Sequence, residues 1–241
     1  SCFWEGQEGS FLLWTFWHVV IGLVVMRTSK EWETPVMSIV GLMQVFLLTF
    51  VLGIYVGSWH IGSSPFLLLK DKLTADPVFL FNDYMRFIPD GRGLNALLQN
   101  YWMVIHPPVL FCGFASITFP FAFALAGLWK GKYTEWIKPA MPYALFAGMV
   151  LGTGILMGGA WAYESLSFGG FWAWDPVENA SLIPWLIIVA GLHNMLIAKK
   201  TGQALRSTFV MIFLAFFFVL YSSFLTRSGI LGDTSVHAFV E

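Results

Sequence analysis

Six long apolar segments constrain this chain more than any other feature of its sequence. Each is 17 to 23 residues long, and a helix needs ~20 residues to cross ~30 Å of hydrocarbon. The segments run over residues 10–26, 35–57, 107–129, 141–161, 181–198 and 208–225. The sequence therefore predicts an all-α integral membrane protein. We expect a single domain over residues 1–241 with about six transmembrane helices and two long connections, 58–106 and 162–181.

The composition also indicates a protein that lies in a membrane. Apolar residues make up 57% of the chain and charged residues only 11%, whereas a soluble domain is about half apolar and about a quarter charged. A soluble fold of this size could not bury so much apolar surface. This excludes a disordered chain, a nucleic-acid binder and a typical soluble enzyme, and it makes membrane lipid the expected surroundings. Cys2 and Cys112 form no CxxC or zinc pattern.

Basic residues gather in the short connections after the first, third and fifth segments. Loops of this kind face the cytoplasm or the mitochondrial matrix. The other connections and the segment after residue 225 then lie on the outer side, in the periplasm or intermembrane space. The basic residues are Arg27, Lys30, Lys130, Lys132, Lys138, Lys199, Lys200 and Arg206.

The second outer connection is rich in glycine and aromatic residues. Gly169 and Gly170 have no side chains, so a flat ligand could approach the backbone there. Phe171, Trp172 and Trp174 follow directly and offer broad apolar faces. Tryptophan at a membrane interface is more commonly an anchor, and that alternative stays open. The combination with a glycine pair favours a ligand-binding loop.

The same run continues into a helix start. Asp175 can cap the helix, Pro176 suits its first position, and Glu178 can return to the cap amide. Capping and a direct role at a binding site both remain open for Asp175.

Two histidines are predicted on the outer side with this loop. His106 precedes the third apolar segment, and Pro107 predicts an extended backbone at His106 with the helix beginning just after it. His237 follows the sixth segment. Imidazoles on either side of an aromatic platform are what bis-histidine haem ligation needs. Two unrelated surface histidines are the alternative.

Two further histidines fall inside apolar segments. His193 follows Pro176 by 17 residues, or ~26 Å along a helix, so it cannot reach a ligand held in the outer loop. It therefore predicts a second, deeper site. For His18 we expect a hydrogen bond to a neighbouring helix.

Residues 169–181, GGFWAWDPVENAS, resemble the tryptophan-rich WWD signature of membrane haem-handling proteins. The whole chain resembles the CcmF family of cytochrome c maturation haem lyases, because further motifs follow in family order. These motifs lie at residues 4–10, 93–100, 104–108, 192–193, 224–229 and 235–239.

The resemblance implies a role for each matching residue. His106 and His237 would ligate the iron of an incoming haem as the catalytic pair, and His193 would ligate a permanent haem b that reduces it. The implied partners are the haem chaperone CcmE, CcmH-type presenters and an apocytochrome c that receives the haem on its CxxCH motif. The implied haem-holding residues are Gly169, Gly170, Phe171, Trp172, Trp174 and Asp175.

The chain also departs from the family. Phe168 stands where the family usually has Trp, and no residue matches the second intramembrane haem ligand, which lies in a later helix of the family. The chain resembles only the amino-terminal to central portion, so a second CcmF polypeptide is implied, as in split mitochondrial forms. It also opens without Met or a recognisable signal peptide, which implies residues ahead of Ser1 or processing. We expect the mitochondrial inner membrane, with a bacterial inner membrane as the alternative.

Two other functions compete with a haem lyase. A CcmC-type carrier or exporter would bind haem in the same loop without forming thioether bonds. A structural subunit of a membrane complex would keep the motif without the activity. The motifs at residues 4–10 and 97–100 favour the CcmF family over CcmC.

Overall fold

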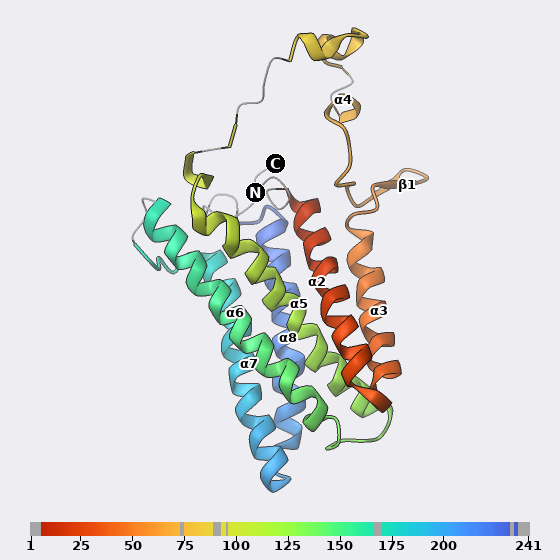
Figure 1. The fold of residues 1–241 in the computed structure, drawn as a ribbon, viewed down its shortest axis with the longest axis vertical. Helices are drawn as coiled ribbons and strands as arrows, with labels where there is room; N and C mark the ends of the chain where they lie inside the picture. Colours follow the sequence, from red (N-terminus) through yellow and green to blue (C-terminus); the bar gives the residue numbers. More distant parts are fainter. Residues whose placement is uncertain are drawn as a thin grey trace.

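The computed structural model describes residues 6–72, 75–88, 93–94, 96–165, 170–231 and 234–235, and six long helices form its body (Figure 1). All six are long and apolar enough to cross a membrane, which confirms the predicted all-α, multi-pass membrane protein. They are α2 (Gln7–Thr28), α3 (Glu33–Thr49), α5 (Tyr101–Trp129), α6 (Ile137–Ser165), α7 (Pro176–Thr201) and α8 (Leu205–Arg227). A 3-10 turn, Lys30–Trp32, runs directly into α3, and the span found there is Lys30–Thr49.

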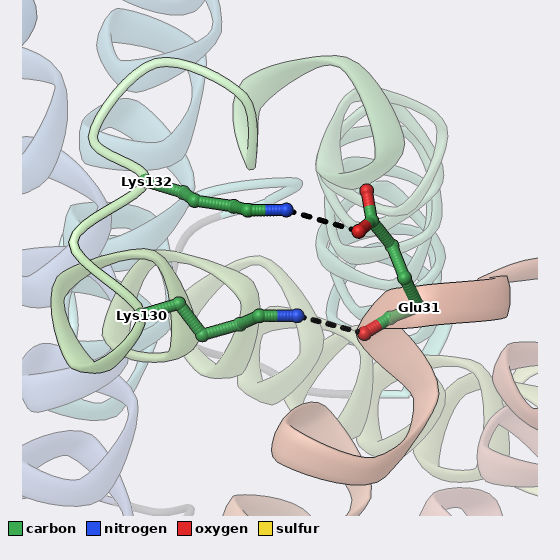
Figure 2. A network of polar contacts seen from close by, with 3 residues as sticks. All are labelled: Glu31, Lys130 and Lys132. Carbon is green, nitrogen blue, oxygen red and sulfur yellow. Dashed lines mark hydrogen bonds and ion pairs between the residues drawn. The ribbon is translucent and has the colours of Figure 1, made fainter.

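The short connections between these helices lie at one end of the bundle, away from the chain termini (Figure 1). Two of them are joined by Glu31, whose carboxylate pairs with Lys132 at 2.9 Å and whose backbone carbonyl accepts from Lys130 at 3.0 Å (Figure 2). The Lys130 ammonium also lies 5.0 Å from the centre of the Trp32 ring. The short connections that carry the predicted basic residues therefore lie together at one end of the molecule. The compartment that it faces stays a prediction.

The segment between α3 and α5 projects beyond the other end (Figure 1). It holds a hairpin of β1 (Ile54–Val56) and β2 (Trp59–Ile61), in which Tyr55 pairs with His60. The prediction of a second span reaching residue 57 is wrong. Gly53 follows the end of the helix and Gly57 lies in the turn between β1 and β2. They take positive φ angles of 58° and 63°, which glycine adopts readily, so the chain leaves the helix and folds back as a hairpin. A single helical turn, α4 (Leu69–Lys72), and three 3-10 turns follow at Pro77–Leu80, Tyr84–Arg86 and Ala96–Leu98.

Helix α5 is the centre of the bundle and packs against α2, α3, α6 and α8. The backbones of α5 and α6 approach closely at two glycines. A Cβ on Gly113 would lie 2.6 Å from the Leu151 Cα, and a Cβ on Gly154 would lie 2.8 Å from the Leu110 Cα. Lipid tails are as apolar as leucine, so membrane helices associate through close packing of this kind.

His18 joins three helices, as expected from the sequence. Gln44 donates a hydrogen bond from Nε2 to the Thr15 carbonyl at 3.0 Å. Oε1 of Gln44 therefore faces His18 and accepts from its Nδ1 at 3.2 Å. Nε2 of His18 then accepts from the Thr118 hydroxyl at 2.9 Å. Both ring nitrogens are thus used in linking α2 to α3 and α5.

We predict that Gly113→Ala lowers the stability of the bundle. The added methyl would meet the backbone of Leu151, which cannot rotate away, and overpacking of this kind typically costs about 1–3 kcal/mol. Thermal unfolding in detergent micelles, followed by tryptophan fluorescence, measures the effect.

Gly41→Ala in α3 is the matched control. Nothing lies within 4 Å of a Cβ at Gly41, and alanine favours a helix by ~1 kcal/mol over glycine. Equal unfolding midpoints for the two variants would contradict the close-packing account.

Candidate functional site

An apolar cavity of about 330 Å³ lies at the end of the bundle opposite the short connections, which is called the outer end after the prediction from the sequence. Its wall is made by helices α2, α5, α6, α7 and α8 and by the loop before α7. This loop, described over residues 170–175, is called the aromatic loop. Phe111, Phe114 and Ile155 give it an apolar interior. His106 and Arg227 bring polar nitrogen atoms to its wall. Of the residues predicted for the site, His106 and Trp172 both line this cavity.

His106 lies in the second turn of α5, so the prediction of an extended backbone at this residue is wrong. The helix begins at Tyr101 because Asn100 caps it, accepting from the Trp102 amide at 2.8 Å. Pro107 and Pro108 stand inside the helix. A proline costs one backbone hydrogen bond, but such losses are tolerated in membrane helices that neighbours support.

The side chain of His106 is held in a defined tautomer. Nδ1 lies 2.7 Å from the carbonyl oxygen of Gly154 on α6. A carbonyl can only accept, so Nδ1 carries the proton and Nε2 carries the lone pair. This is the form of histidine that ligates a metal, with the second nitrogen fixed by a backbone carbonyl.

Two adjacent glycines of α6 make room for the site. A Cβ on Gly158 would lie 2.7 Å from Cε1 of His106, and a Cβ on Gly159 would lie 2.5 Å from Cε1 of Phe171. Two side chains predicted for the site therefore pack directly on the α6 backbone. Neither glycine is among the residues predicted for the site from the sequence. Their signal was a glycine pair inside a helix, where each residue costs ~1 kcal/mol relative to alanine.

The outer ends of α5 and α6 are tied together beside His106. The Glu164 carboxylate on α6 accepts from Asn100 Nδ2 and from Trp102 Nε1, both at 2.9 Å. Trp161 of α6 donates from Nε1 to the Leu97 carbonyl at 3.0 Å. These bonds fix the first turns of α5 against α6 and so fix the height of His106 in the bundle.

The two tryptophans of the aromatic loop share one cavity but differ in their contact with the other. Their rings meet edge to face, with centroids 6.1 Å apart at 89°. Trp172 lines the outer cavity, whereas Trp174 is 69% exposed. Both also line a second apolar cavity of about 490 Å³ between α6 and α7. Trp174 has a φ of 59°, which is strained for a bulky residue, and Asn179 donates to its carbonyl at 2.9 Å.

The predicted capping box at the start of α7 is confirmed. Asp175 Oδ2 accepts from the Val177 amide at 2.9 Å, and Glu178 Oε2 accepts from the Asp175 amide at 3.1 Å. Asp175 Oδ2 also accepts from the Ser235 hydroxyl at 2.6 Å. This bond, between residues 60 positions apart, ties the segment after α8 to the aromatic loop.

Of the remaining predicted residues, the structure describes His193 and Gly170. His193 lies on α7 well below the cavity, exposed on the outside of the bundle, with Nδ1 2.8 Å from the Val189 carbonyl of its own helix. Gly170, with a φ of 94°, precedes Phe171 in the aromatic loop. Gly169 and His237 lie outside the described residues.

Arg227, at the end of α8, is a cavity residue that the sequence analysis passed over. It donates from Nη2 to the Ser10 hydroxyl of α2 at 3.1 Å, and its guanidinium lies 5.7 Å from the centre of the Phe111 ring on α5. In the sequence it is simply a basic residue at the end of an apolar segment.

Taken together, the fold and the site define a multi-pass, all-α membrane protein with an apolar cavity at one end of its bundle, lined by His106 and Trp172. The family model described as "Cytochrome C assembly protein" matches residues 4–231, and the chain belongs to this family. The resemblance stated from the sequence motifs is thereby confirmed.

The chain is similar to "Cytochrome c-type biogenesis protein CcmF" from two bacteria. It is 34% identical to the Pseudomonas fluorescens protein, covering 99% of this chain and 33% of that protein. It is 36% identical to the Haemophilus influenzae protein, covering 99% of this chain and 34% of that protein. A solved structure, "Cytochrome c Heme Lyase CcmF", is 30% identical with a TM-score of 0.71, covering 96% of this chain and 33% of that one. The chain thus spans about a third of the length of these relatives.

We predict that Asp175→Asn is mild and that Asp175→Ala is not. A single oxygen, Oδ2, accepts both the cap bond and the Ser235 bond, so the amide oxygen of asparagine can accept both. Alanine removes both bonds, and loss of a cap alone costs ~1 kcal/mol. Unfolding midpoints in micelles measure the difference.

Cytochrome maturation in cells carrying the same variants gives a second readout. If Asp175→Asn stopped maturation while the protein remained inserted and stable, Asp175 would touch haem or a partner directly and would not act mainly as a cap.

Proposed function

We propose that this chain is part of a haem lyase of cytochrome c maturation, and that it binds haem in the outer cavity for attachment to apocytochrome c. One observation carries the proposal. His106 Nδ1 donates to the Gly154 carbonyl, which puts the lone pair of the ring on Nε2, and His106 and Trp172 line the same apolar cavity. A neutral imidazole in apolar surroundings suits haem, which is flat and mostly apolar and takes nitrogen ligands at its iron.

His106 and His237 are the proposed axial ligands of the incoming haem. The position of Ser235 supports a contribution from His237. Ser235 is buried and bonded to Asp175 at the aromatic loop, and His237 is two residues further along the sequence. Two residues of chain span at most ~7 Å, so the ligand proposed from the sequence is within reach of the loop.

The aromatic loop supplies the proposed walls of the haem site. Trp172 offers an apolar face to the cavity, Phe171 packs on Gly159, and Trp174 adds an exposed face on the outer side. Gly169 and Gly170 would let the porphyrin approach the backbone.

The reaction itself is an addition. Each thiol of the CxxCH motif adds across a vinyl group of haem, so that S–H and C=C become a thioether and no oxidant or leaving group is needed. The proposed partners are the chaperone CcmE, which delivers haem, and CcmH-type proteins, which present the apocytochrome. We place the protein in the mitochondrial inner membrane or a bacterial inner membrane, with the aromatic loop on the outer face.

His193 is the proposed ligand of a second, permanent haem b. Its Nδ1 bonds to the Val189 carbonyl and its side chain is exposed on the membrane-facing surface of α7. That geometry would suit a ligand of haem iron, and a haem held by His193 would supply electrons to the incoming iron. We propose that its other axial ligand comes from a second CcmF polypeptide or a carboxy-terminal region, since the relatives are about three times as long.

We predict that His106→Ala or His237→Ala abolishes haem capture at the outer site and leaves the fold intact. Each change removes one proposed axial ligand, while the close packing of α5 on α6 at Gly113 and Gly154 stays in place. Haem titration followed at the Soret band measures capture, and the yield of holocytochrome c measures function.

His60→Ala is the matched control for these variants. His60 is also an outer histidine, but it lies on the exposed hairpin and stacks on Tyr55. An unchanged holocytochrome yield in the His106→Ala, His237→Ala double variant would overturn the outer site.

We predict that the chain alone binds haem through His193 weakly or as a five-coordinate species. Within the described residues His18 is the other histidine deep in the bundle, and both of its ring nitrogens are already bonded. His193→Ala should therefore remove this haem, while His18→Ala should leave its spectrum unchanged. A six-coordinate low-spin spectrum that is lost in both variants would mean that both ligands are internal.

A further inference from the structure

The outer cavity has one cationic side chain in its described wall, the guanidinium of Arg227. We infer that Arg227 binds the propionate carboxylates of haem and so fixes the orientation of the porphyrin in the cavity. The inference rests on the proposed function, because it assigns a positioning residue within the same outer site.

The cavity lining matches the porphyrin ring of haem but not its carboxylate edge. Phe11, Trp14 and Leu110 continue the apolar lining described above, and they suit the porphyrin ring. Haem also carries carboxylates on one edge, and a carboxylate in apolar surroundings needs a paired cation and hydrogen bonds. A guanidinium meets both needs, because its planar fork of N–H donors matches a carboxylate.

The other polar groups of the cavity are less suited to an anion. Glu178 is itself a carboxylate, and its Oε2 is engaged by the amides of Ala173 and Asp175. The hydroxyls of Ser223 and Thr226 donate to carbonyls of their own helix at 2.9 and 3.1 Å. These groups therefore leave Arg227 as the cation for a carboxylate.

Arg227 is also held in place before any ligand binds. The Ser10 hydroxyl accepts from Nη2, the Phe111 ring lies under the guanidinium, and Glu8 of α2 attracts it electrostatically. These contacts come from α2 and α5, so the charge is fixed on that side of the cavity. A preorganised guanidinium loses little side-chain entropy when it binds a carboxylate.

The position of Arg227 has a consequence for the chemistry. Arg227 belongs to the wall made by α2, α5 and α8, whereas Trp172 belongs to the loop that packs on α6 and leads into α7. Propionates bound to Arg227 turn the opposite edge of the porphyrin, which carries the vinyl groups, toward the aromatic loop. The vinyl groups are the ones that thiols must reach.

The test compares haem with its dimethyl ester, in which both propionates are uncharged. Each is titrated into the protein in detergent micelles, followed at the Soret band, in a His193→Ala background that removes the proposed intramembrane haem. The protein with Arg227 should bind haem roughly 10- to 100-fold more tightly than the ester, the range for hydrogen bonds to a charged group. Arg227→Gln should bind both equally, and Arg227→Lys should retain part of the preference.

Arg206→Gln is the matched control, because Arg206 is an exposed arginine of the same helix at the opposite end of the bundle. It should keep the full preference for haem. Equal affinity for haem and ester with Arg227 present would overturn the inference without requiring any Arg227 variant to fold. If His106→Ala left haem binding unchanged in the same assay, the proposed outer site would fail, and this inference with it.

Discussion

The close contact between α5 and α6 is the constraint on which the outer site depends. Gly113 lies against the backbone of Leu151, and Gly154 lies against that of Leu110. In a bilayer, where apolar burial gives helices little reason to associate, this proximity makes dispersion contacts effective. The same proximity brings the Gly154 carbonyl within 2.7 Å of His106. The contact that stabilises the bundle therefore also selects the histidine tautomer that can bind a metal.

The features predicted correctly from the sequence are local ones. A transmembrane helix is encoded in about twenty consecutive residues. The capping box from Asp175 to Glu178 spans four residues. His18 was expected to bond to a neighbouring helix because an intramembrane imidazole needs partners. The helical conformation of His106 was not predicted, because the rule for a residue before proline acts locally. Here it is outweighed by the Asn100 cap and by packing on α6.

Several features missed from the sequence arise between distant segments. The bond from Ser235 to Asp175 and the place of Arg227 in the cavity wall depend on how α8 returns to the outer end of the bundle. His193 is an intermediate case. Its depth followed from its distance along α7, but its exposure depends on which faces of α7 the other helices cover. A single sequence gives depth in the membrane far more readily than it gives direction around a helix.

The central claim is that Nε2 of His106 ligates haem iron in the outer cavity, and imidazole rescue tests it most directly. His106→Gly removes the ligand and leaves a space beside Gly158 that free imidazole can enter. The account predicts that this variant loses the low-spin spectrum of the outer haem and regains it when imidazole is added. A low-spin spectrum in the variant before imidazole is added, identical to that of the unaltered protein, would contradict the claim.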